Sequence, residues 1–440
     1  MKKIIYITTI IFLLGIGKTI AQDTLKLSLK QAIELGLNNR NDLKSVYVNA
    51  NIAKNNIDKA KKELLPDISV NSEIKYYDKL QPTYVPAGIL NNKGAEKLSL
   101  GMKSNTLVSL DLNYSIYKPG LSQNIKIAKN DLLLSQEKSR AKQLDIKTEI
   151  SMAYYNVLLK QIQFDITREI QMRYKFYNDL AKAKLDNGTL LESDALQVDL
   201  DYKNAVSNTN KNEQNYSLAV QNLKYKMNVL PAVIILCTDS LIGSDDIPTT
   251  GFDYENIIIK RSEIKQLEIK VSNNYLEFTK ARLNYLPTVS LFANYSQVFA
   301  GSQFTYGNNF YWSPVDYIGI KFSIPITGNF KNGSNVRDSK LKIKQMEYDL
   351  KQKKADITYE IQQATSKLNN AQKNLTIAQD NYLLSRKICE QKKNQYTVGS
   401  FSYEKLIEIE NTLNDTENNY ISAVYDFLVA KIEYQQSLGE

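Results

Sequence analysis

The sequence contains no histidine, and its 440 residues include only two cysteines, Cys237 and Cys389. Histidine is the commonest general base and metal ligand, so its absence excludes histidine-dependent hydrolases and most zinc and copper sites. The two cysteines are far apart and match no metal-binding or redox spacing, which predicts unreactive thiols without a disulfide framework. We therefore expect no cofactor, no metal centre and no enzymatic activity.

The apolar run at the N-terminus is short. It extends from Ile4 to Ile16, follows two lysines and precedes the small-residue site Thr19-Ile20-Ala21. A membrane-spanning helix needs about 20 apolar residues, so this segment is typical of a cleaved secretory signal peptide. We predict a signal peptide at residues 1–21 and a mature chain that begins at Gln22.

The chain also lacks dense blocks of one charge. Its formal net charge is +9, but the lysines are scattered among aspartates and glutamates. Nucleic-acid binding usually requires a concentrated basic patch, so we expect no nucleic-acid partner.

The sequence repeats itself. Residues 40–69 align without a gap on residues 261–290, so that Leu65-Pro66 matches Leu286-Pro287. A second block, 145–188, aligns in the same way on 356–399. These matches predict a tandem duplication. The expected organisation is a first repeat over 22–230, an inter-repeat linker over 231–252 and a second repeat over 253–440.

Each repeat contains one predicted hairpin of two strands, over 67–117 and over 288–326. In the first strand, Ile68, Val70 and Ile74 alternate with polar residues, which is the period of a strand with one apolar face. Aromatic residues near the strand ends favour strands that cross a membrane over a soluble sheet with one wet face. The hairpin tips, 78–106 and 299–314, are expected to be loops.

Long helices follow the hairpins. The segment from Leu121 to Asn187 would be about 100 Å long as one helix, and Pro119-Gly120 and Gly328, with Gly333 after it, are expected to precede the outgoing helices. In the second repeat, apolar residues from Ile357 to Tyr382 follow a heptad pattern that predicts a coiled coil.

Two glycines interrupt the predicted helical segments. Gly188 and Gly399 predict tight reversals at 187–189 and 398–400, because glycine accepts the left-handed backbone conformation. A helix kink is the alternative at each glycine, but their matching repeat positions favour a helical hairpin.

The expected fold class is therefore an α+β membrane protein, with antiparallel helical coiled coils and four strands that contribute to a β-barrel. Four strands leave open edges, which are costly in lipid, and closed barrels begin at about eight strands. Several copies must then share one barrel, and both dimers and trimers meet this condition.

This arrangement resembles the TolC-like outer membrane efflux proteins. The resemblance rests on "LSLKQAIELGLNNRNDLKSV", on the junctions "KAKKELLPDIS" and "KARLNYLPTVS", on "GIKFSIPITG" and on the two glycine tips, in this order. It implies a homotrimer in the outer membrane of a Gram-negative cell, with a barrel in the outer membrane lipid and a helical tunnel in the periplasm. It also implies a periplasmic adaptor protein and an inner-membrane transporter as partners, so that the chain acts as their exit duct.

The resemblance further implies a periplasmic gate at the helical tips. Tyr396 matches a latch tyrosine of the family and Asp194 matches its acidic partner, whereas Phe401 replaces the expected arginine. Lys405 and Glu408 occupy positions where the family places two acidic residues around the narrow end. An ordinary solvated helix pair is the alternative for Lys405 and Glu408.

Apolar residues beside the turns are the predicted adaptor contacts. A helical hairpin end has few core partners, so these side chains are expected to be exposed. With the turn glycines, this set comprises Gly188, Leu190, Leu191, Gly399, Phe401 and Tyr403.

Two other classes of function stay open at this point. An exported coiled-coil interaction or adhesion protein without a pore would explain the helices but not the two strand hairpins. A secreted hydrolase would need paired carboxylates, and Asp245-Asp246 lies in the linker, where nothing predicts a pocket.

Overall fold

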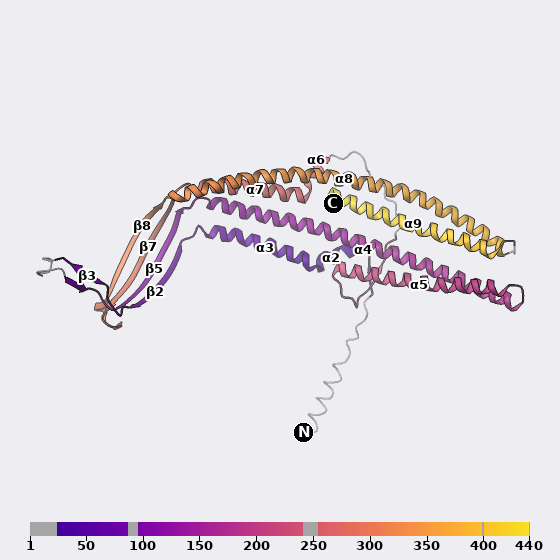
Figure 1. Ribbon diagram of the computed structural model, residues 1–440, viewed down its shortest axis with the longest axis horizontal. Coiled ribbons are helices and arrows are strands. Elements are labelled where there is room, and N and C mark those ends of the chain that lie inside the picture. The colour runs from indigo at the N-terminus through magenta and orange to yellow at the C-terminus, as the bar shows by residue number, and fades with distance from the viewer. Residues whose placement is uncertain (1–23, 87–95, 241–253, 398–399, 440) are drawn as a thin grey trace, which may run out of the picture. The chain divides into compact units, whose positions relative to one another are not determined.

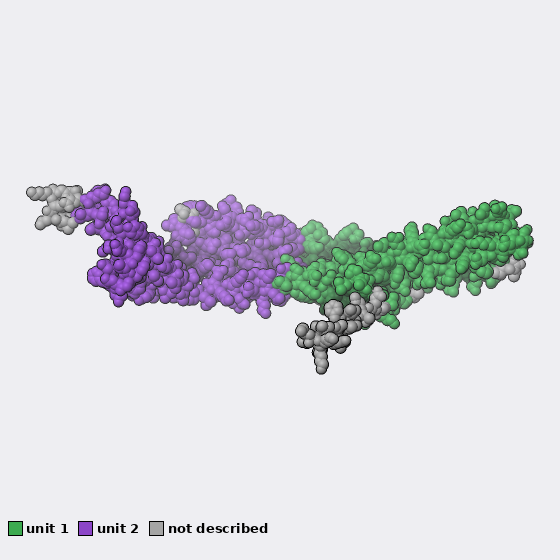
Figure 2. Space-filling view, turned by 90° about the horizontal axis from the view of Figure 1, so that it is seen from below, with its two compact units in different colours: residues 1–48, 137–265, 351–440 green, residues 49–136, 266–350 purple. Residues whose placement is uncertain are grey.

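The computed structural model describes residues 24–86, 96–240, 254–397 and 400–439. The predicted signal peptide, Gly399 and most of the predicted linker lie outside these ranges. The chain divides into two compact units (Figure 2). Unit 1 comprises residues 1–48, 137–265 and 351–440, and unit 2 comprises residues 49–136 and 266–350.

Unit 2 contains an antiparallel sheet of four strands in the order β2-β5-β7-β8 (Figure 1). The strands are β2 (Asp67–Tyr76), β5 (Ser104–Tyr117), β7 (Thr288–Gly301) and β8 (Trp312–Ser323). The two predicted repeats meet where β5 pairs with β7, and β2 and β8 are the edges of the sheet.

The two faces of this sheet differ in chemistry. Directly paired residues share a face, and the register places Val70, Leu110 and Tyr295 together on one face and Asn71 and Ser109 on the other. Apolar side chains dominate the first face, where Asp316 is the charged exception. Its apolar members include Ile68, Val70, Ile74, Leu110, Leu112, Tyr114, Leu291, Tyr295, Ile318, Ile320 and Phe322.

The expectation of a loop over 78–106 is wrong. This segment contains a two-stranded antiparallel sheet of β3 (Pro82–Val85) and β4 (Glu96–Ser99), and β5 already begins at Ser104. The predicted loop 299–314 is also shorter than expected, because β7 extends to Gly301 and a 3-10 turn, η1 (Asn309–Tyr311), precedes β8. Cross-strand backbone pairing between segments this short is not visible in a periodic pattern.

The helices of unit 2 adjoin the sheet. They are the later parts of α3 (Asn41–Lys62) and α7 (Ser262–Leu283) and the first parts of α4 (Leu121–Asp186) and α8 (Ile326–Thr397). Gly328 and Gly333 therefore lie inside α8 and do not precede it, contrary to the prediction. A glycine in a helix interior lowers the stability of the helix by about 1 kcal/mol relative to alanine. The many backbone hydrogen bonds of the 72-residue helix α8 outweigh this loss.

Unit 1 is mainly helical. It holds α2 (Leu29–Asn39), α5 (Glu192–Met227), α6 (Tyr254–Lys260), α9 (Tyr403–Leu438) and the later parts of α4 and α8. Strand β1 (Thr24–Leu27) pairs in parallel with β6 (Ile234–Cys237), so part of the predicted linker is a strand.

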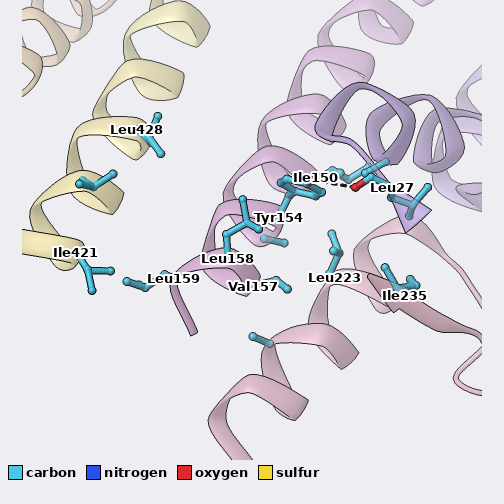
Figure 3. Close-up of a cluster of buried hydrophobic side chains, with 14 of the residues drawn as sticks. Leu27, Ile150, Tyr154, Val157, Leu158, Leu159, Leu223, Ile235, Ile421 and Leu428 are labelled. Atoms are coloured by element: carbon cyan, nitrogen blue, oxygen red, sulfur yellow. Dashed lines mark hydrogen bonds between the residues drawn. The ribbon is translucent and has the colours of Figure 1, made fainter. Parts of the chain in front are cut away.

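The largest core of unit 1 packs around α4 (Figure 3). Ile150 and Tyr154 of α4 contact this core together with Leu223 of α5 and Ile235 of β6. The Tyr154 hydroxyl donates a hydrogen bond of 2.8 Å to the carbonyl oxygen of Leu27, so the small sheet is tied to α4.

The heptad residues of α8 lie against α9. Ala364 and Leu368 form a buried cluster with Phe427, Ala430 and Tyr434. Within the described ranges, no helix is long and apolar enough to pass through a membrane.

Candidate functional site

The first helical tip is a reversal of the chain. Gly188 has φ +67°, and a Cβ atom at this position would lie within 4 Å of no other atom, so the backbone conformation and not space favours glycine. The amide of Thr189 donates to the carbonyl of Lys184 at 2.9 Å, which closes the end of α4. The second tip has the amide of Ser400 bonded to the carbonyl of Gln395 at 3.0 Å, while Gly399 itself lies outside the described residues.

Helices α4 and α5 form the first helical hairpin, and α8 and α9 form the second. Aromatic rings from both helical hairpins pack together near the tips. The ring of Tyr177 on α4 lies 6.0 Å from that of Tyr396 on α8 and 5.8 Å from that of Tyr403 on α9, both edge to face. We call this group and its neighbours the tip cluster. It comprises Tyr177, Ala181, Val198 and Leu406, with Leu190, Tyr396, Phe401, Tyr403 and Ile407 partly buried around them.

The tip cluster corrects one expectation about the adaptor contacts. Leu190, Phe401 and Tyr403 are partly buried, because the two hairpins supply packing partners that one hairpin end would lack. Leu191 is different, since 69% of it is exposed.

A buried carboxylate lies beside the tip cluster. Glu410 of α9 is 1% exposed, and its Oε1 accepts a hydrogen bond of 2.6 Å from the hydroxyl of Tyr177. Its Oε2 lies 3.6 Å from Nε of Arg173, an ion pair longer than a hydrogen bond. Within the described chain, Oε2 has no hydrogen-bond partner. Glu410 thus joins α9 to α4, that is, the second hairpin to the first.

Two further bonds connect the same helices. The hydroxyl of Tyr174 donates to Oδ1 of Asn411 at 3.2 Å, and Arg173 donates to Oδ1 of Asn414 at 3.1 Å. Burial raises the pKa of Tyr174 to about 12, and burial together with Glu410 raises the pKa of Tyr177 still further. Both phenols therefore keep their protons and act as donors at neutral pH. We call these six residues the Glu410 site: Arg173, Tyr174, Tyr177, Glu410, Asn411 and Asn414.

Sequence reasoning missed the Glu410 site. A glutamate in a charged helix is usually solvated, and α9 has several of them. A signal was nevertheless present, because Glu410 follows Leu406 by four residues and precedes Leu413 by three, which is the spacing of a buried helix face.

The predicted gate residues are only partly brought together. Tyr396 packs in the tip cluster with Lys184 Nζ 5.5 Å from its ring centroid, whereas Asp194 is exposed and accepts a 3.2 Å bond from Ser193. Lys405 and Glu408 are both exposed. Among the described residues, no hydrogen bond joins Tyr396 to Asp194 and no ion pair joins Lys405 to Glu408.

Arg40 and Arg261, which match in the predicted repeats, have similar surroundings. Arg40 contacts Asp42 at 2.5 Å and Glu149 at 2.8 Å, and it donates to the carbonyl of Lys226 near the end of α5 at 3.4 Å. These contacts connect the start of α3, the middle of α4 and the end of α5. Sequence alignment had matched Arg40 to Arg261 but had not predicted these bonds.

Arg261 repeats this pattern at a more buried position. It contacts Glu263 at 2.6 Å and Glu360 at 3.3 Å, and it donates to the carbonyls of Gln436 and Ser437 at 3.1 and 2.5 Å. Arg261 is 5% exposed, compared with 14% for the side chain of Arg40. Arg261 is thus the less solvent-exposed of the two arginines.

The two thiols lie in separate places. Burial raises the pKa of Cys237 to about 12, and it also raises the pKa of Cys389, so neither forms a thiolate readily. Among the described residues, no group of three or more cysteines, aspartates or glutamates could hold a metal ion.

Comparisons with known proteins agree with this architecture. The family model described as "Outer membrane efflux protein" matches residues 32–228 and 254–440. The alkaline protease secretion protein AprF of Pseudomonas aeruginosa is 21% identical over 243 residues, which are 54% of this chain and 48% of AprF. The chain thus spans about half the length of the curated relative that it matches.

Solved structures share the fold. The CmeC outer membrane channel of Campylobacter jejuni has a TM-score of 0.76 and 17% identity, over 93% of this chain and 85% of CmeC. The outer membrane protein VceC of Vibrio cholerae has a TM-score of 0.71 and 14% identity, over 93% of this chain and 96% of VceC. The largely helical chain with its four-stranded sheet therefore has a TolC-like outer membrane channel fold.

Proposed function

This chain belongs to the outer membrane efflux protein family, and from that premise we propose that it is the outer-membrane exit duct of a tripartite efflux or type I secretion system. Family membership also means that the chain is not an enzyme. In the proposed role, substrates pass from an inner-membrane transporter and a periplasmic adaptor through this protein to the cell exterior. The observation that carries the proposal is the four-stranded sheet with one apolar and one polar face.

The apolar face fits contact with outer membrane lipid. In a transmembrane barrel, apolar side chains point outward and polar side chains point into the lumen. Strands β2 and β8 have no further partner in the sheet of one chain. Since unpaired backbone groups are costly in lipid, β8 of one copy would pair with β2 of the next, and three copies of the four-stranded sheet would give twelve strands.

Exposed apolar residues on the helical hairpins support the same assembly. Such residues lie on both hairpins, at similar distances from the turns, and would become buried if the first hairpin of one copy packed on the second hairpin of its neighbour. A head-to-tail contact of this kind closes into a ring. The residues are Met172, Phe176, Leu196 and Leu200 on the first hairpin and Leu384 and Ile388 on the second.

The helical tips would form the periplasmic gate. In this proposal Tyr396 and Asp194 contribute to a latch at the tip, and Lys405 and Glu408 face the narrow end of the tunnel. The Glu410 site links the two hairpins of one copy by a hydrogen bond and an ion pair, so in this proposal it holds the closed arrangement. An adhesion protein without a pore has no use for a sheet with an apolar face, which favours the duct.

Assembly tests the proposed function directly. We expect the detergent-extracted protein to have the mass of a trimer by light scattering with the detergent contribution subtracted, and to form ion-conducting pores in planar bilayers. A monodisperse monomer, or a trimer without any conductance, would contradict the proposal.

Docking to the adaptor provides a second test, at the first tip. Leu191→Asp replaces an exposed apolar side chain, which does not belong to the tip cluster, with a charged one. We expect export to be lost while the amount of trimer stays unchanged. Thr189→Asp is the control, because it adds the same charge at an exposed position of the same turn, and it should retain export. A parallel fall in trimer abundance for Leu191→Asp would mean that Leu191 packs between copies.

A further inference from the structure

Asp111 lies on the polar face of the sheet in unit 2, where three neutral donors converge on its carboxylate. Its Oδ2 accepts hydrogen bonds from Asn71 at 2.8 Å and from Ser109 at 2.7 Å. Its Oδ1 accepts a bond of 2.6 Å from Asn294. Strands β2, β5 and β7 each contribute one donor, so the carboxylate is held in one orientation across the sheet.

Among the residues that the structure describes, no cation neutralises this carboxylate. Its cross-strand partners are Ser69 and Asn294, both uncharged. The lysine on the same face of β2, Lys75, is already paired with Glu73 at 2.8 Å. It lies opposite Asn105, six residues along β5 from Asp111, which corresponds to about 20 Å.

In the four described strands, one further lysine lies on this face, and it is also remote. Lys321 of β8 pairs with Ser290, which pairs with Ser115 of β5. Four residues separate Ser115 from Asp111, or about 14 Å along the strand. Both distances exceed the screening length of about 10 Å at 0.1 M salt. The charge of Asp111 is therefore fixed in place by hydrogen bonds but is not cancelled.

We infer that Asp111 sets an ionic preference of the barrel lumen, favouring cationic over anionic solutes. The inference rests on the proposed function, since the polar face lines a lumen only when the apolar face contacts lipid. In a trimer, the three copies of Asp111 lie at one height and form a ring of three carboxylates. A ring of one charge sign in a narrow polar passage attracts counter-ions and repels co-ions.

The test is the reversal potential of single trimers in planar bilayers under a salt gradient. Asp111→Asn should lower the cation-to-anion permeability ratio about two- to fivefold when the dilute side is near 0.1 M salt, where screening is moderate. Asp316→Asn is the matched control. It removes the same charge from the opposite face of the sheet, because Asp316 shares its face with Tyr295 and Leu110, and it should leave the ratio unchanged.

A second variant separates the charge from the hydrogen bonds. Asp111→Cys should show the lowered ratio, and an anionic methanethiosulfonate reagent should restore it, whereas a cationic reagent should reverse the preference. The wild type, which keeps Cys237 and Cys389, controls for reaction elsewhere.

The outcomes distinguish a failure of the inference about Asp111 from a failure of the proposed exit-duct function. Conducting trimers of Asp111→Asn with an unchanged ratio would overturn the inference and leave the exit duct intact. If neither neutral variant formed trimers, Asp111 would be a structural residue and the inference would likewise fail. A wild type without conductance would instead overturn the proposed function.

Discussion

Tyr177→Phe is expected to weaken the closed state of the helical tips and to raise the mean single-channel conductance strongly. The substitution removes the hydroxyl that donates to Glu410, a carboxylate that is 1% exposed. Hydrogen bonds to charged groups contribute about 1.5–3 kcal/mol, and each 1.4 kcal/mol changes an equilibrium about tenfold. Loss of this bond in each copy would thus shift the ratio of closed to open tips by roughly ten- to a hundredfold per copy.

Tyr403→Phe is the matched control for this experiment. Its hydroxyl is buried in the same cluster, but it has no hydrogen-bond partner among the described residues. The control therefore removes a buried phenol oxygen without breaking a link between the hairpins, and its conductance should stay near that of the wild type. Equal conductance for Tyr177→Phe and the wild type would show that the Glu410 site does not hold the gate.

Arg261→Met is expected to produce the largest loss of stability. Glu263, Glu360 and the last carbonyls of α9 would lose the guanidinium that satisfies them. Glu263 and Glu360 stay 37% and 43% exposed, so the main cost is the loss of the charged hydrogen bonds to the carbonyls of α9, about 1.5–3 kcal/mol each. We expect little trimer in the membrane, and a lower temperature of trimer dissociation on heating in detergent for whatever trimer forms.

Two comparisons sharpen this prediction. Arg261→Lys should rescue only a small part of the loss, because an ammonium group cannot reproduce the two-sided geometry of the guanidinium. Lys342→Met breaks the exposed pair with Asp338 and should leave the dissociation temperature near that of the wild type, because exposed ion pairs contribute little to stability. If Arg261→Met and Lys342→Met dissociated at the same temperature, the Arg261 site would have no special structural role.

The strands were predictable from the sequence for a physical reason. Alternation such as that of Ile68, Val70 and Ile74 has a period of two only in a sheet with one apolar face, and the register agrees with it. The boundary at Gly328 was misjudged because glycine signals a break only where tertiary contacts do not stabilise the helix. Short pairings such as β3 with β4 depend on backbone bonds across the sequence, which periodicity does not record.

The Glu410 site was beyond sequence reasoning for a different reason. The site forms only because α4 packs near α9, which brings together residues more than 200 positions apart. Tyr177 and Glu410 each fit an ordinary helix when read alone. Likewise, the exposure of Phe401 and Tyr403 could not be judged before the first hairpin was known to supply the ring of Tyr177.

The two arginine sites have a consequence for the order in which the chain can mature during export. All partners of Arg40 lie within the first repeat, the last being Lys226, so that site can close while the second repeat is still crossing the inner membrane. Arg261 needs Gln436 and Ser437, which emerge almost last. Until then β5 pairs only with β2, and the edge that β7 will cover stays open. The first repeat would therefore leave a helical core and a strand pair with an open edge on β5, a species that periplasmic chaperones for outer membrane proteins would be expected to bind until the second repeat arrives.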